Sequence, residues 1–390
     1  MDRASSVFTP LRLRDIEIPN RVMVSPMCMY AAADGIASDY HLVHLGRFAL
    51  GGAGLVVVEA TGITAQGRIS HHDLGLWNDE QADALARVAT FLKAHGSIPG
   101  IQLAHAGRKA STTPPWERGR PLVDADAASG LGPWPVIGPS AVSAGPGWPV
   151  PHELDERGIA ESIRAWGDAA RRARAVGFEV IDLHGAHGYL LHSFLSPISN
   201  TRGDRYGGDL EGRMRYPLEV VRAVRAAIGD EVALFYRMSV TDGVEGGITL
   251  DDSILFARAL GDAGVDLIDV SSGGIVTDRA IDTRVRRGFA FHAPFSGPLR
   301  AATGLPVATV GLVVDALQAQ AIIDHGDADL VALGREMLHD PNWAHHARAS
   351  LDLEDWERWH REAAWALAAR HASMARLRES GESPMTRYSG

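Results

Sequence analysis

The sequence predicts an α/β protein folded as a closed (β/α)₈ barrel. Three observations lead to this prediction: eight short apolar runs, helical patterns between most of them, and a glycine at the end of most helical patterns. Runs that are apolar throughout are typical of strands buried on both faces, and hence of a parallel sheet. Unsegregated βα units favour a barrel. The eight runs are 21–27, 54–59, 98–103, 178–181, 232–238, 265–270, 306–310 and 329–333.

Amphipathic helices are predicted between most of these strands from apolar residues at helical spacing. The patterns cover 80–95, 160–176, 213–228, 251–263 and 314–325. Glycines 96, 177, 229, 264 and 326 follow them, as expected for helix C-termini. A doubly wound open sheet is the alternative architecture, but it would need a G-x-G-x-x-G motif after the first strand, and residues 25–28 do not provide one.

Three segments depart from the repeating pattern. Residues 11–21 alternate apolar and polar side chains and predict an N-terminal hairpin. Residues 104–158 are rich in Pro, Gly and Trp, which indicates an ordered cover over one barrel mouth; its tryptophans either shape specificity or only pack. We expect the barrel to occupy 1–345, and 346–390 to form a C-terminal helical extension and tail that contributes to a subunit interface.

Composition narrows the function. The chain has 390 residues, 46% hydrophobic, and a net charge of −10 without blocks of like charge, so neither nucleic acid nor a membrane surface is an expected partner. With no signal-peptide pattern and no membrane-length apolar stretch, we expect a cytoplasmic protein. Cys28 is the only cysteine, which excludes an internal disulfide or an iron–sulfur cluster; its simplest role is that of a small buried side chain. No metal site is predicted.

A cluster of two imidazoles and a phenol follows the strand at 178–181. His184, His187 and Tyr189 lie within six residues, where a strand gives way to a turn or a short helix. In a barrel the C-terminal strand ends share one mouth, so these side chains can converge on one small polar atom. A surface turn with incidental histidines is the alternative.

The last two strands predict a phosphate site. Gly311 and Gly334 follow strands seven and eight, and Arg335 comes directly after Gly334. Glycines let a phosphate approach backbone N–H groups, and an arginine adds a charged partner. Ordinary turn glycines beside a surface arginine are the alternative.

Two polar residues interrupt otherwise apolar strands. Arg237 must lie in the barrel or at its mouth, where it needs an anionic or electron-rich partner; a structural salt bridge to Glu59 or Asp182 is the alternative. Gln102 offers both a donor and an acceptor, as the edge of a planar heterocycle would require.

Taken together, these strand ends resemble the Old Yellow Enzyme family of FMN-dependent ene-reductases, which are (β/α)₈ barrels. The resemblance runs from about residue 11 to residue 341. It is carried by residues 19–21, 25–27, 101–108, 184–189, 196–208 and 334–335. Cys28 and the ending that contains Arg387 resemble the subclass called thermophilic-like, which has a thiol near the flavin.

The resemblance implies a tightly bound, non-covalent FMN and NAD(P)H as a transient reductant. The implied flavin contacts are Ser25, Pro26, Met27 and Cys28 near N5 and O4, Ala60 and Gln102 at the pyrimidine, Arg237 near N1 and O2, and Gly311, Gly334 and Arg335 at the phosphate. The implied substrate contacts are His184 and His187 as hydrogen-bond donors, Tyr189 as proton donor, Tyr30, and Arg387 reaching in from a neighbouring subunit.

The expected reaction is reduction of the activated C=C bond of α,β-unsaturated carbonyl or nitro compounds, in a homodimer or homotetramer. Two alternatives remain open. One is a flavin-binding barrel with a sensor role. The other is a flavin-free barrel lyase acting on a phosphorylated substrate, for which Lys109 is the sole lysine near a strand end.

Overall fold

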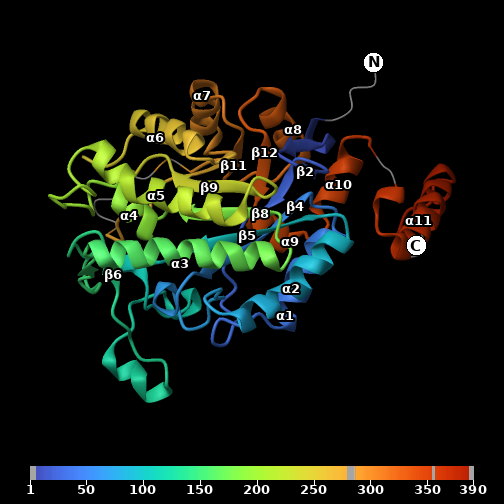
Figure 1. Ribbon diagram of the computed structural model, residues 1–390. Coiled ribbons are helices and arrows are strands. Elements are labelled where there is room, and N and C mark those ends of the chain that lie inside the picture. The colour runs from blue at the N-terminus through green and yellow to red at the C-terminus, as the bar shows by residue number, and fades with distance from the viewer. Residues whose placement is uncertain (1–5, 279–284, 286, 354–355, 386–390) are drawn as a thin grey trace.

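A closed barrel of eight parallel strands forms the centre of the protein, which confirms the predicted fold class (Figure 1). The computed structural model describes residues 6–278, 285, 287–353 and 356–385. Neighbouring strands pair in chain order, and the last strand pairs with the first to close the barrel. The strands are β3 (Val22–Val24), β4 (Leu55–Gly62), β5 (Ile98–Ala104), β8 (Val180–Gly185), β9 (Ala233–Ser239), β10 (Leu267–Ser271), β11 (Val307–Val310) and β12 (Leu330–Leu333).

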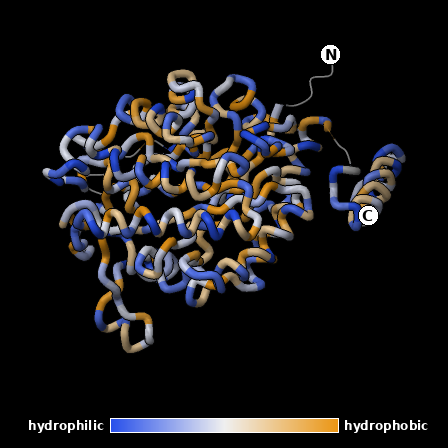
Figure 2. Tube along the Cα trace, viewed as in Figure 1, coloured by the Kyte–Doolittle hydropathy of each residue, from blue (hydrophilic) through white to orange (hydrophobic). Residues whose placement is uncertain are grey.

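Helices surround the barrel, and apolar residues concentrate between them and the strands (Figures 1 and 2). The helices between strands are α1 (Asp39–Leu50), α2 (Asp79–Ala94), α3 (Glu156–Ala175), α4 (Leu190–Leu195), α5 (Leu210–Ile228), α6 (Leu250–Asp262), α7 (Ala293–Thr303) and α8 (Ala316–Asp324). After β12 come α9 (Arg335–His339) and α10 (Trp343–Ser350). Each strand is therefore followed by at least one helix, as a (β/α)₈ barrel requires.

Two of these helices escaped prediction for identifiable reasons. Helix α1 buries His41 and His44 among its apolar residues, so polar side chains interrupt the apolar stripe that a periodicity search seeks. Helix α7 has one proline in its first turn and Pro298 in its interior, and proline is normally a sign that a helix ends. In both cases burial against the barrel decides the conformation.

The predicted N-terminal hairpin closes one end of the barrel. Strands β1 (Leu11–Leu13) and β2 (Ile16–Ile18) pair antiparallel. Their apolar side chains pack in the same cluster as Met23 and Leu55, which lie near the N-terminal ends of β3 and β4. Any site that admits a ligand into the barrel must therefore open at the opposite end, where the strands terminate.

The long loop between β5 and α3 covers the mouth only in part. It contains short 3₁₀ turns and the paired strands β6 (Ile137–Gly138) and β7 (His152–Glu153), and one section projects from the body as an arm (Figure 1). Trp134 packs toward the mouth in the same apolar cluster as Tyr30 and Tyr189. Trp116 is 66% exposed and touches Tyr30 edge-on, with ring centroids 5.8 Å apart.

The C-terminal extension differs from the expected boundary at residue 345. Helix α10 spans that position, and Trp343, Ala344 and Ala347 are buried in the main core. Beyond it, η6 (Trp356–Arg358) and α11 (Arg361–Glu379) lie beside the barrel, and α11 buries none of its residues (Figure 1). Arg387 lies outside the described residues. None of the helices described is long and apolar enough to span a bilayer.

Candidate active site

The structure brings the two histidines and the tyrosine together at the end of β8. The ring centroids of His184 and His187 are 5.1 Å apart, and those of His184 and Tyr189 are 4.7 Å apart. His184 is buried, whereas the other two are half-buried, and the three rings form one group at the end of β8. The surface-turn alternative does not describe this arrangement.

The turn that carries His187 is held in an uncommon backbone conformation. His187 has a φ of 59°, in the left-handed region, and is followed by Gly188 at 76°. The His187 N–H donates to Ser239 Oγ at 3.1 Å, and its carbonyl accepts from Lys109 Nζ at 2.8 Å. Lys109 Nζ also donates to the Gly274 carbonyl at 2.9 Å and so ties the β8 turn to the loop after β10.

A buried pair supports the same turn from below. The Gly188 N–H donates to His192 Nδ1 at 2.8 Å, and His192 Nε2 donates to Asp242 Oδ1 at 2.7 Å. Asp242 also accepts from Ser196 Oγ at 2.7 Å. Burial favours the neutral carboxyl, but His192 and these hydrogen bonds outweigh it and lower the pKa of Asp242.

The protonation states suit hydrogen-bond donation to a ligand oxygen. Burial lowers the pKa of both His184 and His187, so both rings are neutral at pH 7. His184 Nδ1 accepts the Ala186 N–H at 3.3 Å, which leaves the proton of His184 on Nε2. Burial also raises the pKa of Tyr189 and keeps its phenol protonated.

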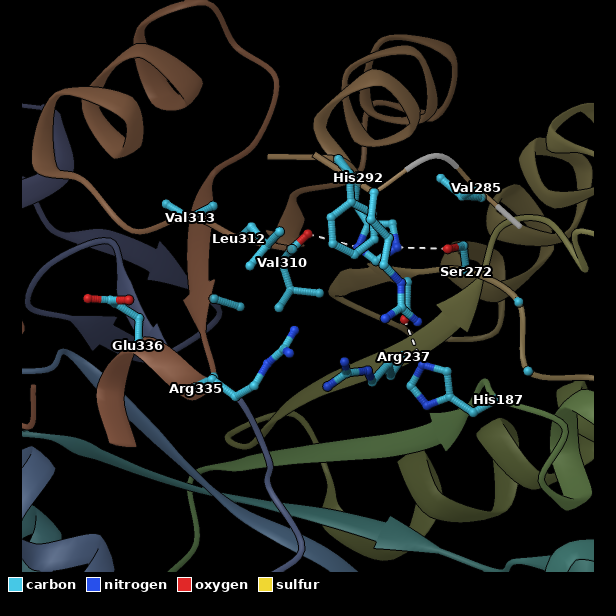
Figure 3. A pocket seen from close by; sticks show the side chains of 18 of the residues that line it. His187, Arg237, Ser272, Val285, His292, Val310, Leu312, Val313, Arg335 and Glu336 are labelled. Atoms are coloured by element: carbon cyan, nitrogen blue, oxygen red, sulfur yellow. Dashed lines mark hydrogen bonds between the residues drawn. The ribbon is translucent and has the colours of Figure 1, made fainter. Parts of the chain in front are cut away.

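A cavity of about 480 Å³ adjoins this cluster, within the usual size range of small-molecule sites (Figure 3). Five predicted site residues line it: His187, Arg237, Gly311, Gly334 and Arg335. The side chains of Arg237 and Arg335 extend into it from β9 and from the start of α9 (Figure 3). One face of the mouth is therefore cationic.

The cavity suits a phosphate-bearing heterocycle. Arg237 Nε at the cavity and Ser25 Oγ at the neighbouring end of β3 are buried and have no hydrogen-bond partner among the described residues. A Cβ added to Gly334 would meet only Met27 Sδ, at 3.7 Å, so the backbone there is open to close approach. Gly311 has a φ of 121°, which a residue with a side chain rarely adopts.

The remaining predicted cofactor residues lie on neighbouring strand ends but do not line this cavity. The Ser25 N–H donates to the Leu333 carbonyl at 2.9 Å and joins the end of β3 to that of β12, with Pro26 and Met27 following. Ala60 lies at a register irregularity of β4. Gln102 Nε2 donates to Asp182 Oδ2 at 2.7 Å inside the barrel.

Cys28 lies on the opposite, apolar side of the mouth. It is half-buried and packs in one cluster with Tyr30, Trp134 and Tyr189. Burial raises the pKa of the Cys28 thiol well above its ordinary value, so the thiol stays protonated. Tyr30 has a φ of 54°, and Glu59 accepts the N–H of the preceding residue, Met29, at 3.0 Å.

The ion pair of Arg237 corrects a sequence-based expectation. Its partner is Asp269 on β10, with Nη1 and Oδ2 3.4 Å apart, rather than Glu59 or Asp182. Asp269 was not singled out from the sequence, although it interrupts an apolar strand just as Arg237 does. His292 forms a hydrogen bond with Ser272 Oγ at 2.8 Å and borders the cavity (Figure 3). It does not follow directly on a predicted strand, so the sequence did not identify it as a site residue.

Comparison with known proteins agrees with this geometry. The sequence profile of the NADH:flavin oxidoreductase / NADH oxidase family matches residues 6–354. The chain belongs to this family. An NADPH dehydrogenase of Geobacillus thermodenitrificans is 39% identical over 350 residues, covering 89% of this chain and 95% of the relative. Another, from Listeria innocua, is 40% identical over 349 residues, with the same coverages.

Solved structures of this flavin oxidoreductase family share the fold. Morphinone reductase superposes with a TM-score of 0.71 at 26% identity, covering 90% of this chain and 91% of that one. The protein is thus a flavin-dependent NAD(P)H oxidoreductase. This membership sets aside the flavin-free lyase, and the two carbonyls held by Lys109 Nζ likewise give no support to a Schiff-base role.

Proposed function

We propose that the protein binds FMN and uses NAD(P)H to reduce the activated C=C bond of α,β-unsaturated carbonyl or nitro compounds. The observation that carries this proposal is the convergence of His184, His187 and Tyr189 beside the cavity that contains Arg237. Two neutral imidazoles and a protonated phenol are the groups needed to hold an oxygen and to deliver a proton. NADPH dehydrogenases at about 40% identity support NADPH as reductant.

The cationic side of the mouth fits FMN. Gly311, Gly334 and Arg335 would hold the phosphate, and Arg237 would lie by N1 and O2, where negative charge accumulates on reduction. The other proposed contacts are Ser25, Pro26, Met27 and Cys28 at the N5 and O4 edge, and Ala60 and Gln102 at the pyrimidine. Bound FMN supplies hydride transfer to carbon, and the protein orients and protonates the substrate.

His184 and His187 would donate hydrogen bonds to the carbonyl or nitro oxygen. These bonds draw electron density from the β-carbon and strengthen as charge develops on the oxygen in the transition state. The proton on His184 Nε2 is available for such a bond, because Nδ1 accepts from Ala186. His187 Nε2 is already engaged with Ser271 Oγ, at 2.7 Å, so Nδ1 is the nitrogen that would donate to the ligand, with Ser271 Oγ donating to Nε2.

Tyr189 would protonate the α-carbon. Its raised pKa keeps the proton in place until the developing carbanion provides a base, and proton donation of this kind contributes about 10²–10⁴-fold in rate. Tyr30 and Trp134 would contact the rest of the substrate from the apolar side. We also propose a homodimer or homotetramer in which Arg387 reaches a neighbouring site.

Anaerobic reduction tests this proposal. The purified protein should be yellow, should be bleached by NADPH or NADH, and should regain its colour on addition of an activated alkene, with the saturated product formed in equal amount. A yellow protein that neither nicotinamide bleaches would favour the sensor role. Reoxidation by oxygen but by no alkene in a broad panel would exclude ene-reduction.

A further inference from the structure

Two carboxyl groups are buried inside the barrel directly below the mouth. Asp182 on β8 and Asp269 on β10 are both 0% exposed. Asp269 is the register partner of Arg237 on the neighbouring β9, and Asp182 is that of Gln102 on β5. Asp269 thus lies beside Arg237, which lines the cavity, and Asp182 lies beside Gln102.

These carboxyl groups have fewer partners than two buried anions need. Asp182 Oδ1 and both oxygens of Asp269 are buried without a hydrogen-bond donor in the part of the chain that the structure describes. Asp182 Oδ2 accepts from Gln102, and among the described residues the 3.4 Å contact with Arg237 Nη1 is the one ion pair of Asp269. Removing an unpaired charge from water costs far more than removing a neutral acid.

The charges around the two carboxyl groups favour the binding of one proton by the pair. Among the described residues, Arg237 is the cation that faces both carboxyl groups. The phenol of Tyr236 lies beside Asp182, and the neutral imidazole of His184 lies beside Arg237. With both carboxylates ionised, the group would carry a net charge of −1 in a buried site. Burial, followed by repulsion from Asp269, raises the pKa of Asp182, and burial raises that of Asp269, both against the attraction of Arg237.

We propose that the Asp182–Asp269 pair is a proton-binding site that takes up a second proton when the flavin is reduced. This rests on the proposed function, because it places the reduced ring beside Arg237. The hydride of NAD(P)H brings two electrons and leaves one additional negative charge on the ring, and Arg237 then faces two anionic groups, the ring and the remaining carboxylate, in place of one. One proton from solvent binds the remaining carboxylate and restores the balance. It leaves again when the substrate reoxidises the flavin.

The pH dependence of the flavin midpoint potential tests this coupling. For a two-electron couple, each proton taken up adds about 30 mV per pH unit, since a tenfold change in an equilibrium constant corresponds to about 30 mV. We expect the FMN-loaded wild type to show a slope of about 60 mV per pH unit over the range in which the pair takes up its proton. The slopes for Asp182→Asn and Asp269→Asn should each fall to about 30 mV per pH unit. Asp230→Asn, whose side chain is 88% exposed, is the matched control and should behave as wild type.

Infrared difference spectroscopy of the wild type tests the same proposal without any variant. Reduction should add a protonated-carboxyl C=O band that shifts in D₂O, and this band should be absent from whichever Asn variant folds. A wild-type slope of about 30 mV throughout, a steep slope kept in both Asn variants, or no new carboxyl band would overturn the coupling. Electrochemical reduction needs neither NAD(P)H nor an alkene, so a failure of ene-reduction alone would leave this result unaffected.

Discussion

His187 shows how a single residue can be strained by its surroundings. A non-glycine residue at a φ of 59° costs on the order of 1–3 kcal/mol, and it persists only where neighbouring contacts over-determine it. Here those contacts come from Ser239, Ser271 and Lys109, on three different parts of the barrel. This strained backbone conformation directs the imidazole toward the mouth beside His184. A relaxed turn would not hold it there.

Glu59 allows a test of the electrostatics at the mouth. The residue is 2% exposed, and burial raises the pKa of its carboxyl from 4.5 to about 8. Between pH 4.5 and 8 the folded state therefore keeps a proton that the unfolded state has released. The contribution of this proton to the free energy of unfolding is lost as the pH rises through that window. Glu59→Gln should remove the effect, because glutamine does not titrate.

We expect the unfolding free energy of the wild type to fall relative to Glu59→Gln as the pH rises from 5 to 8, by up to about 1.4 kcal/mol per pH unit. Urea denaturation of both proteins at several pH values measures this difference. Stability curves that run parallel over the whole range would show that Glu59 is ionised in the folded protein.

Cys28 gives a second prediction for a single residue. If its protonated thiol lies at the N5 edge of the flavin, Cys28→Ala should shift the midpoint potential and leave the thermal unfolding midpoint nearly unchanged. Spectroelectrochemical titration of the variant and the wild type measures this shift. An unchanged potential would leave Cys28 as a buried spacer.

At the level of elements, strands and most helices could be predicted because their apolar patterns are local. The roles of Asp269 and Lys109 could not be predicted, because they depend on contacts between segments far apart in the chain. Likewise, the sequence identified the His184–Tyr189 cluster through one short segment, whereas its support by His192 and Asp242 spans 50 residues. Local patterns thus predict which residues reach the mouth but not what holds them there.

The loops after β5, β8 and β10 are joined by Lys109, which makes a sharp test possible. The chain has only two lysines, and Lys93 is 68% exposed in a surface pair with Glu179. Lys109→Met should release the His187 and Gly274 carbonyls and lower kcat/KM by about 10–100-fold, since small misplacements of catalytic groups have effects of this size. Flavin content should remain that of the wild type.

Lys93→Met is the matched control and should keep full activity. Steady-state kinetics of both variants, with flavin content measured by absorbance, separates a misplaced turn from a loss of flavin. Equal kinetics in the two methionine variants would mean that Lys109 does not position the turn.

At the scale of the whole molecule, the hairpin β1–β2 fills the N-terminal end of the barrel, and the ligand cavity opens at the C-terminal end. The family match stops at residue 354, and α11 beyond it buries no residue. Sequence patterns predicted a helical extension here, but not that α10 belongs to the barrel core, because its apolar residues Trp343, Ala344 and Ala347 also fit an exposed amphipathic helix.

Truncation after Leu353 should therefore leave a folded, flavin-binding barrel. We expect the thermal midpoint to fall by no more than about 5 °C, as for the loss of one or two kcal/mol. If the removed residues 354–390, the larger part of the extension, contribute to a subunit interface, light scattering should show a smaller assembly than the full chain forms. Loss of cooperative unfolding, or an unchanged assembly mass, would contradict this division of the chain.

We propose that Tyr189 donates its proton to the substrate at the barrel mouth, beside the reduced flavin. Stopped-flow measurement of both half-reactions in wild type and Tyr189→Phe tests it most directly. In Tyr189→Phe we expect reduction by NADPH to be unchanged and reoxidation by an activated alkene to slow by about 10²–10⁴-fold. Equal slowing of the two half-reactions, or no slowing of reoxidation, would contradict it.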